Sequence, residues 1–93
     1  MRFPAVSGSF YTPSVPALRA EVREYLASAR KNVAQKERLA IVCPHAGYIY
    51  SGRCAAFSYA SCSNWKSKNL TAIIIGPNHT GFGTPSSVSF DEW

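Results

Sequence analysis

The sequence predicts an α/β fold built on one βαβ unit with parallel strands, preceded by an amphipathic helix. Two uninterrupted apolar runs, at 39–43 and 70–75, lack polar alternation, which is typical of strands buried on both faces. Between them, residues 51–62 have small residues at helical spacing. A strand, a helix and a second strand in this order predict a right-handed crossover between parallel strands.

The predicted first helix covers residues 14–31, after an irregular lead-in. Its apolar residues recur at spacings of three and four, which places them on one helical face: Val15, Leu18, Val22, Tyr25, Leu26 and Ala29. Ser14 can cap the first turn, and Pro16 falls where a missing N–H costs nothing. These features predict an amphipathic helix that covers a sheet.

Proline, glycine and serine residues mark where the remaining predicted elements begin and end. Pro44 ends the first apolar run, and Ser51 can cap the helix predicted at 51–62. Gly76 and Pro77 end the second run, and residues 88–90 predict the start of a third strand. Because two strands do not make a stable parallel sheet, we expect residues 1–93 to be the incomplete N-terminal part of a single larger domain. An open strand edge then predicts self-association of the isolated chain.

Composition narrows the function classes. The chain has 93 residues, of which 46% are hydrophobic, and a net charge of +5. Its cations are scattered and form no recognition motif, so we predict no nucleic-acid partner. Three cysteines without a CxxC spacing favour a reducing, cytoplasmic compartment. We find no signal peptide and no apolar run of membrane-spanning length, which predicts no membrane partner.

The two histidines are the candidate metal ligands. His45 and His79 each come shortly after a predicted strand, and adjacent parallel strands lie about 4.8 Å apart. Two imidazoles at neighbouring strand ends can converge on one ion, and neutral imidazole suits iron, copper or zinc. Neither segment contains a carboxylate, so a third ligand is expected outside the chain. The alternative is that each histidine is an ordinary turn residue.

A second set of residues is predicted to bind a small molecule or a peptide beside these histidines. The set is Tyr48, Tyr50, Asn78, Phe82 and Trp93. Aromatic side chains at a concave edge are typical of ligand sites, which gives a non-catalytic binding module as the alternative function. The aromatic residues can equally be ordinary core or rim residues. No catalytic residue is identified, so whether the protein is an enzyme stays open.

Three blocks of sequence, at 4–11, 44–52 and 76–81, resemble the Memo-like family in order and approximate spacing. The resemblance implies a fold shared with class III extradiol ring-cleaving dioxygenases and metal-ligand roles for His45 and His79. It implies iron or copper as the metal and a possible redox role. It also implies a further cysteine ligand from a C-terminal half, to which no cysteine of this chain corresponds. The animal member of the family binds phosphotyrosine peptides, and the resemblance supplies no settled reaction.

Overall fold

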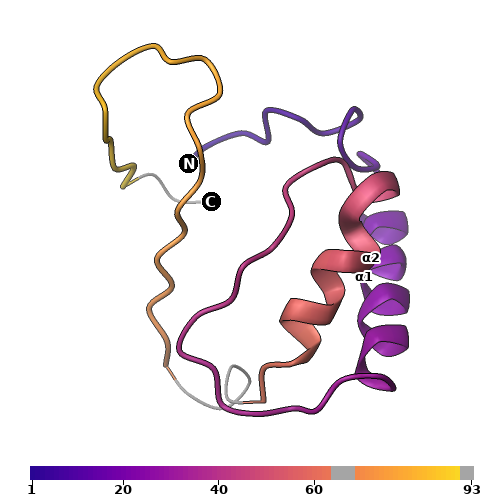
Figure 1. The fold of residues 1–93 in the computed structure, drawn as a ribbon. Helices are drawn as coiled ribbons and strands as arrows, with labels where there is room; N and C mark the ends of the chain where they lie inside the picture. The colour runs from indigo at the N-terminus through magenta and orange to yellow at the C-terminus, as the bar shows by residue number, and fades with distance from the viewer. Residues whose placement is uncertain (64–68, 91–93) are drawn as a thin grey trace.

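Two α-helices form the ordered framework of the chain. The computed structural model describes residues 1–63 and 69–90, and in these ranges the elements are α1, Val15–Arg30, and α2, Tyr48–Ala60 (Figure 1). The two helices pack against each other. Extended chain makes up residues 37–46 and 69–78, which Figure 1 draws without strand arrows. We call the described residues 69–90 the arm.

Helix α1 confirms the helix predicted at 14–31. The Ser14 side chain accepts a hydrogen bond from the Ala17 N–H at 3.5 Å, and Pro16 occupies the first turn. Arg30 stands in the last turn, where its charge suits the negative end of the helix dipole. The helix forms as predicted because spacing, cap and terminal charge are all local properties of this segment.

Helix α2 begins three residues earlier than the predicted start at Ser51. Its N-cap is Gly47, whose carbonyl accepts hydrogen bonds from the N–H groups of Tyr50 at 2.9 Å and Ser51 at 3.1 Å. The Ser51 hydroxyl does not cap the helix and instead donates to the Ala46 carbonyl at 3.0 Å. As a result, Tyr48 and Tyr50 belong to the first turn of the helix, not to the loop before it.

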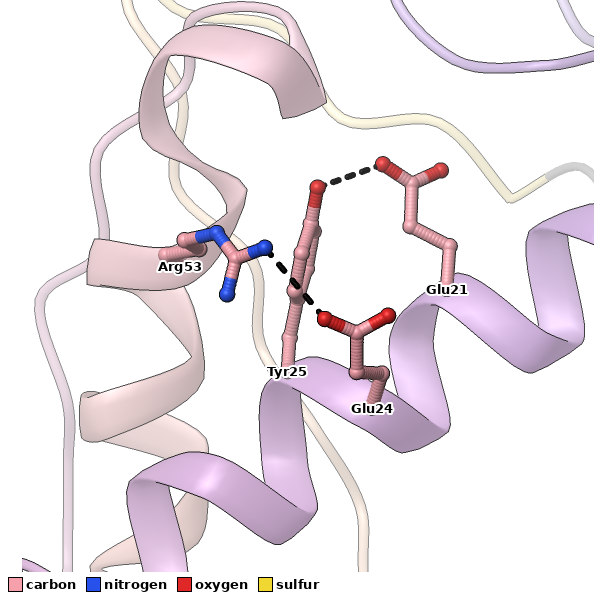
Figure 2. A network of polar contacts seen from close by, with 4 residues as sticks. All are labelled: Glu21, Glu24, Tyr25 and Arg53. Carbon is pink, nitrogen blue, oxygen red and sulfur yellow. Dashed lines mark hydrogen bonds and ion pairs between the residues drawn. The ribbon is translucent and has the colours of Figure 1, made fainter.

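The contact between the helices has a small apolar core and a polar border. Three alanines are buried, and partly buried residues pack around them: Ala29, Ala56 and Ala60, with Tyr25, Leu26 and Val33. At the border, Tyr25 donates to Glu21 at 2.6 Å, and Arg53 of α2 pairs with Glu24 of α1 at 3.3 Å (Figure 2). The Arg53 guanidinium also lies over the Tyr25 ring, 4.8 Å from its centroid. An exposed pair of this kind contributes little stability, so the helices depend mainly on close packing.

The α/β prediction is wrong: residues 1–63 and 69–90 contain two helices, two isolated β-bridges and no strand. The run at 39–43 is extended, and Val42 is 91% exposed. The run at 70–75 is exposed throughout, with Ile74 at 93%, and residues 88–90 are exposed and form no third strand. An apolar run becomes a buried strand only when other segments pair with its backbone and cover its faces. The described part of the chain pairs neither run with a second strand, and it covers the run at 39–43 only on the side that lies along α2.

The chain exposes more surface to solvent than a compact monomer of its size would. The solvent-accessible surface is 8162 Å², whereas a compact monomer of this size would expose about 5,300 Å². The radius of gyration is 14.8 Å, against about 12 Å expected for a compact domain of 93 residues. Large apolar side chains of the arm contribute to this area, since its isoleucine, valine and phenylalanine residues face solvent. No helix of the described chain is both long enough and apolar enough to cross a membrane.

Gly52 is predicted to control how closely the helices approach. A Cβ atom at this position would lie 2.8 Å from Cε2 of Tyr25, which is closer than real contacts. Replacing Gly52 by alanine gains about 1 kcal/mol of helix propensity, but overpacking of this kind costs typically about 1–3 kcal/mol. We therefore expect Gly52→Ala to lower the free energy of unfolding, measured by denaturant titration of the protein expressed from its complete reading frame.

The control for Gly52→Ala is the same change in a Tyr25→Ala background. Without the ring, only the propensity gain remains, so the change should then stabilise by about 1 kcal/mol. The same sign and size in both backgrounds would show that Tyr25 does not limit the approach of the helices.

Candidate functional site

His45 lies in the short loop before α2, and backbone contacts hold this loop from two sides. The Tyr48 N–H donates to the Phe10 carbonyl at 2.8 Å, which ties the loop to the N-terminal lead-in. On the other side, the Ser51 hydroxyl holds the Ala46 carbonyl. Gly47 eases this close approach, since a Cβ there would make a tight contact of 3.3 Å with the Phe10 carbonyl oxygen. The His45 ring itself is exposed.

The segment that precedes His45 lies along α2. The Ser58 hydroxyl donates to the Val42 carbonyl at 2.8 Å. Further back, Lys36 forms a parallel bridge with Cys62, in which the Lys36 N–H donates to the Ser61 carbonyl at 2.9 Å. These contacts fix the extended segment on one helix, and so they also fix the base of the His45 loop.

His79 lies in a tight turn of the arm that one side chain organises. The Asn78 side-chain oxygen accepts hydrogen bonds from the Thr80 N–H at 3.2 Å, the Thr80 hydroxyl at 3.0 Å and the Gly81 N–H at 3.0 Å. The Asn78 amide nitrogen donates to the Phe82 carbonyl at 3.0 Å. Gly81 has φ +71°, a left-handed conformation that favours glycine.

The two histidines meet although they come from different parts of the structure. Their Nε2 atoms lie 3.1 Å apart, and the ring centroids lie 5.0 Å apart with the planes tilted by 35°. Two imidazole nitrogens bound to one ion at about 2.0–2.1 Å are separated by about 2.9–3.4 Å, depending on the angle at the metal. The observed separation falls in this range. It also suits a direct hydrogen bond in which one ring donates and the other accepts.

The part of the chain that the structure describes offers no third ligand beside this pair. No group of three or more histidine, cysteine, aspartate or glutamate side chains is close enough there to hold an ion. The residues present therefore fit two of the positions of a metal ion. The roles of His45 and His79 as ligands stay a prediction.

The residues predicted to bind a peptide or small molecule lie on α2 and in the turn that carries His79, apart from Trp93. Tyr48 is half-buried and its ring packs on Tyr11, with centroids 5.5 Å apart. Tyr50 on α2 is 86% exposed and Phe82 on the arm is 84% exposed. The polar side-chain atoms of Asn78 are engaged within its own turn, and Trp93 lies outside the described residues. The binding role of this set stays a prediction.

A groove between the helices was missed by the sequence analysis. It has a volume of about 360 Å³ and is lined by α1, α2 and the segment before His45, including Leu26, Cys43, Tyr48 and Tyr59. Burial and the neighbouring Cys43 raise the pKa of Tyr59, so its phenol stays neutral at physiological pH. The apolar spacing of α1 predicts a face that covers a sheet, whereas part of that face lines this groove.

Comparisons with known proteins agree along the whole chain. Residues 2–93 match the family model described as Memo-like protein. The chain is similar to a MEMO1 family protein of Methanosarcina barkeri, at 44% identity over 93 residues, and to one of Archaeoglobus fulgidus, at 43%. Each alignment covers 100% of this chain and 33% of the relative, so the chain spans about one third of the length of these relatives. No solved structure matches the chain.

Proposed function

Because the chain belongs to the Memo-like protein family, we propose that His45 and His79 are two ligands of an iron or copper site in the complete protein. The observation that supports this proposal most directly is the separation of 3.1 Å between the two Nε2 atoms. Both rings are exposed and neither is buried against apolar neighbours, so an ion can reach them. Neutral imidazole is a common ligand of both metals.

The proposed site needs at least one more ligand. In the described chain no third metal-binding side chain lies beside the pair, and the chain spans about one third of its relatives. We infer that the third ligand comes from residues beyond the described ranges 1–63 and 69–90. Iron or copper held there would supply Lewis-acid or redox chemistry to a bound molecule. This chain's own part is to supply two neutral imidazoles from separately anchored loops. The three free cysteines support a reducing, cytoplasmic setting for such a metal.

Metal content tests the proposal. We expect the protein expressed from its complete reading frame to purify with iron or copper, and the double variant His45→Ala, His79→Ala to retain less than about a tenth of it, since outer-shell changes alone cost 10- to 100-fold in affinity. Elemental analysis by mass spectrometry measures both metals at once.

The control for this experiment is Thr84→Val. It removes one hydroxyl hydrogen bond of the arm, from Thr84 to the Ser86 carbonyl at 2.7 Å, and leaves both imidazoles in place. Its metal content should equal that of the wild type. Equal metal in the double variant and the wild type would mean that the two histidines are not ligands.

A further inference from the structure

The turn that carries His79 is organised by Asn78, whose side chain hydrogen-bonds to several neighbouring residues of the turn. Its oxygen accepts three hydrogen bonds and its nitrogen donates one, all to residues within four positions along the chain. The Thr80 hydroxyl is linked further, because it also accepts from the Phe82 N–H at 3.3 Å. With its oxygen holding three donors, Asn78 has little capacity left to bind an external ligand.

The direction of His79 depends on this turn, because every residue from 69 to 90 is exposed. Packing against a core therefore cannot fix the ring, and the hydrogen bonds that flank His79 along the chain are those of Asn78. Gly81 contributes to the same turn through its left-handed φ of +71° and through its N–H, which donates to Asn78. Although His79 lies on an exposed segment, its Nε2 atom lies 3.1 Å from the Nε2 atom of His45.

We propose that Asn78 is a positioning residue, which holds the turn so that the His79 imidazole faces that of His45. This inference rests on the proposed function and gives Asn78 a role other than the ligand-binding one predicted from the sequence. The amide side chain acts on the metal only through the orientation of His79. Outer-shell partners of this kind typically change metal affinity by about 10- to 100-fold when they are removed.

The test measures ring contact and metal affinity separately, in the protein expressed from its complete reading frame. In the metal-free protein with isotopically labelled histidine, we expect a nuclear Overhauser effect between the His45 and His79 ring protons. In Asn78→Ala this signal should disappear, and the affinity for added Cu(II) or Fe(II) should fall by about 10- to 100-fold. Far-UV circular dichroism and the melting temperature of the remaining fold should stay unchanged.

Two further variants distinguish positioning from a general loss of stability. Asn78→Asp keeps the oxygen that accepts three hydrogen bonds but loses the donation to the Phe82 carbonyl, so it should retain more of the ring contact and of the metal affinity than Asn78→Ala does. Gly81→Ala should weaken the ring contact, because a Cβ makes the left-handed conformation unfavourable. Gly76→Ala is the matched control: its Cβ would also meet open space, but Gly76 has no positive φ, so it should behave as wild type.

Each outcome has a defined meaning. An Asn78→Ala protein that keeps both the ring contact and the wild-type affinity overturns the inference, and so does a wild type without the ring contact. If Asn78→Asp loses the contact as completely as Asn78→Ala, the donation to the Phe82 carbonyl is needed as well as the acceptor oxygen, and Asn78 remains the positioning residue. If the wild type shows the contact, Asn78→Ala loses it and neither binds metal, then the positioning role holds while the proposed metal site is wrong.

Discussion

Replacing either His45 or His79 alone by alanine is expected to lower the affinity for iron or copper about as much as replacing both. The reason is that two nitrogens 3.1 Å apart can hold the same ion, so removal of one leaves the other without a chelate partner. We expect each single variant to lose at least about 100-fold in affinity, beyond the effect of an outer-shell residue. The double variant should add little, because changes at residues that share one partner are not additive.

Competition with a chelator of known affinity gives the dissociation constants for the wild type, both single variants and the double variant. Thr84→Val, which changes a hydrogen bond elsewhere on the arm, serves as the matched control and should bind as the wild type does. If the two single losses instead sum to the loss in the double variant, the histidines belong to independent sites. If one single variant binds normally, only the other histidine is a ligand.

The isolated 93-residue chain is expected to self-associate. Within residues 1–63 and 69–90 the buried core consists of three alanines, whereas Ile73, Ile74 and Ile75 are 86%, 93% and 92% exposed. Each large apolar side chain gains about 1.5–3 kcal/mol when it is fully buried, and extended backbone with free N–H and C=O groups is a template for pairing with another chain. Sedimentation velocity should therefore show dimers or larger species at micromolar concentration, without a cooperative thermal transition of a monomer.

A matched pair of variants identifies the surface responsible. Ile73→Lys with Ile75→Lys should weaken self-association at least about ten-fold, because both changes remove apolar surface from the exposed run. Ser86→Lys with Ser87→Lys adds the same charge to the same arm and should have a smaller effect. A soluble wild-type monomer that unfolds cooperatively would show that the exposed run is covered within this chain.

Features that depend on the local sequence could be predicted. Features that depend on contacts between distant segments could not. The helix at Val15–Arg30 was predicted because its cap, proline and apolar spacing all lie within the segment. The start of α2 was missed because it depends on Gly47, which approaches the Phe10 carbonyl from far along the chain. The apolar run at 70–75 has the composition of a buried strand, but composition does not show whether a partner segment is present.

The candidate site shows the same division between local and long-range information. Both histidines could be identified from the sequence because they are the only two in the chain and follow apolar runs. Their contact occurs without the predicted strands, since the geometry comes from the His45 loop and the turn around Asn78. The ligand-binding role predicted for Asn78 stays a prediction, and its hydrogen bonds within the turn could not be foreseen, because a polar residue beside a histidine has the same sequence pattern in either case.

The contact between His45 and His79 has a thermodynamic consequence for the whole arm. It joins positions 34 residues apart, and because α2 lies between them, closing this loop costs at most about 3 kcal/mol of chain entropy beyond a constant term. An ion held by both rings would act as a removable cross-link that offsets this cost. Part of its binding free energy would then go into restraining the arm, so the intrinsic affinity of the two imidazoles would exceed the measured one. Chelation would release the restraint, and the exposed isoleucines would be free to reach other molecules.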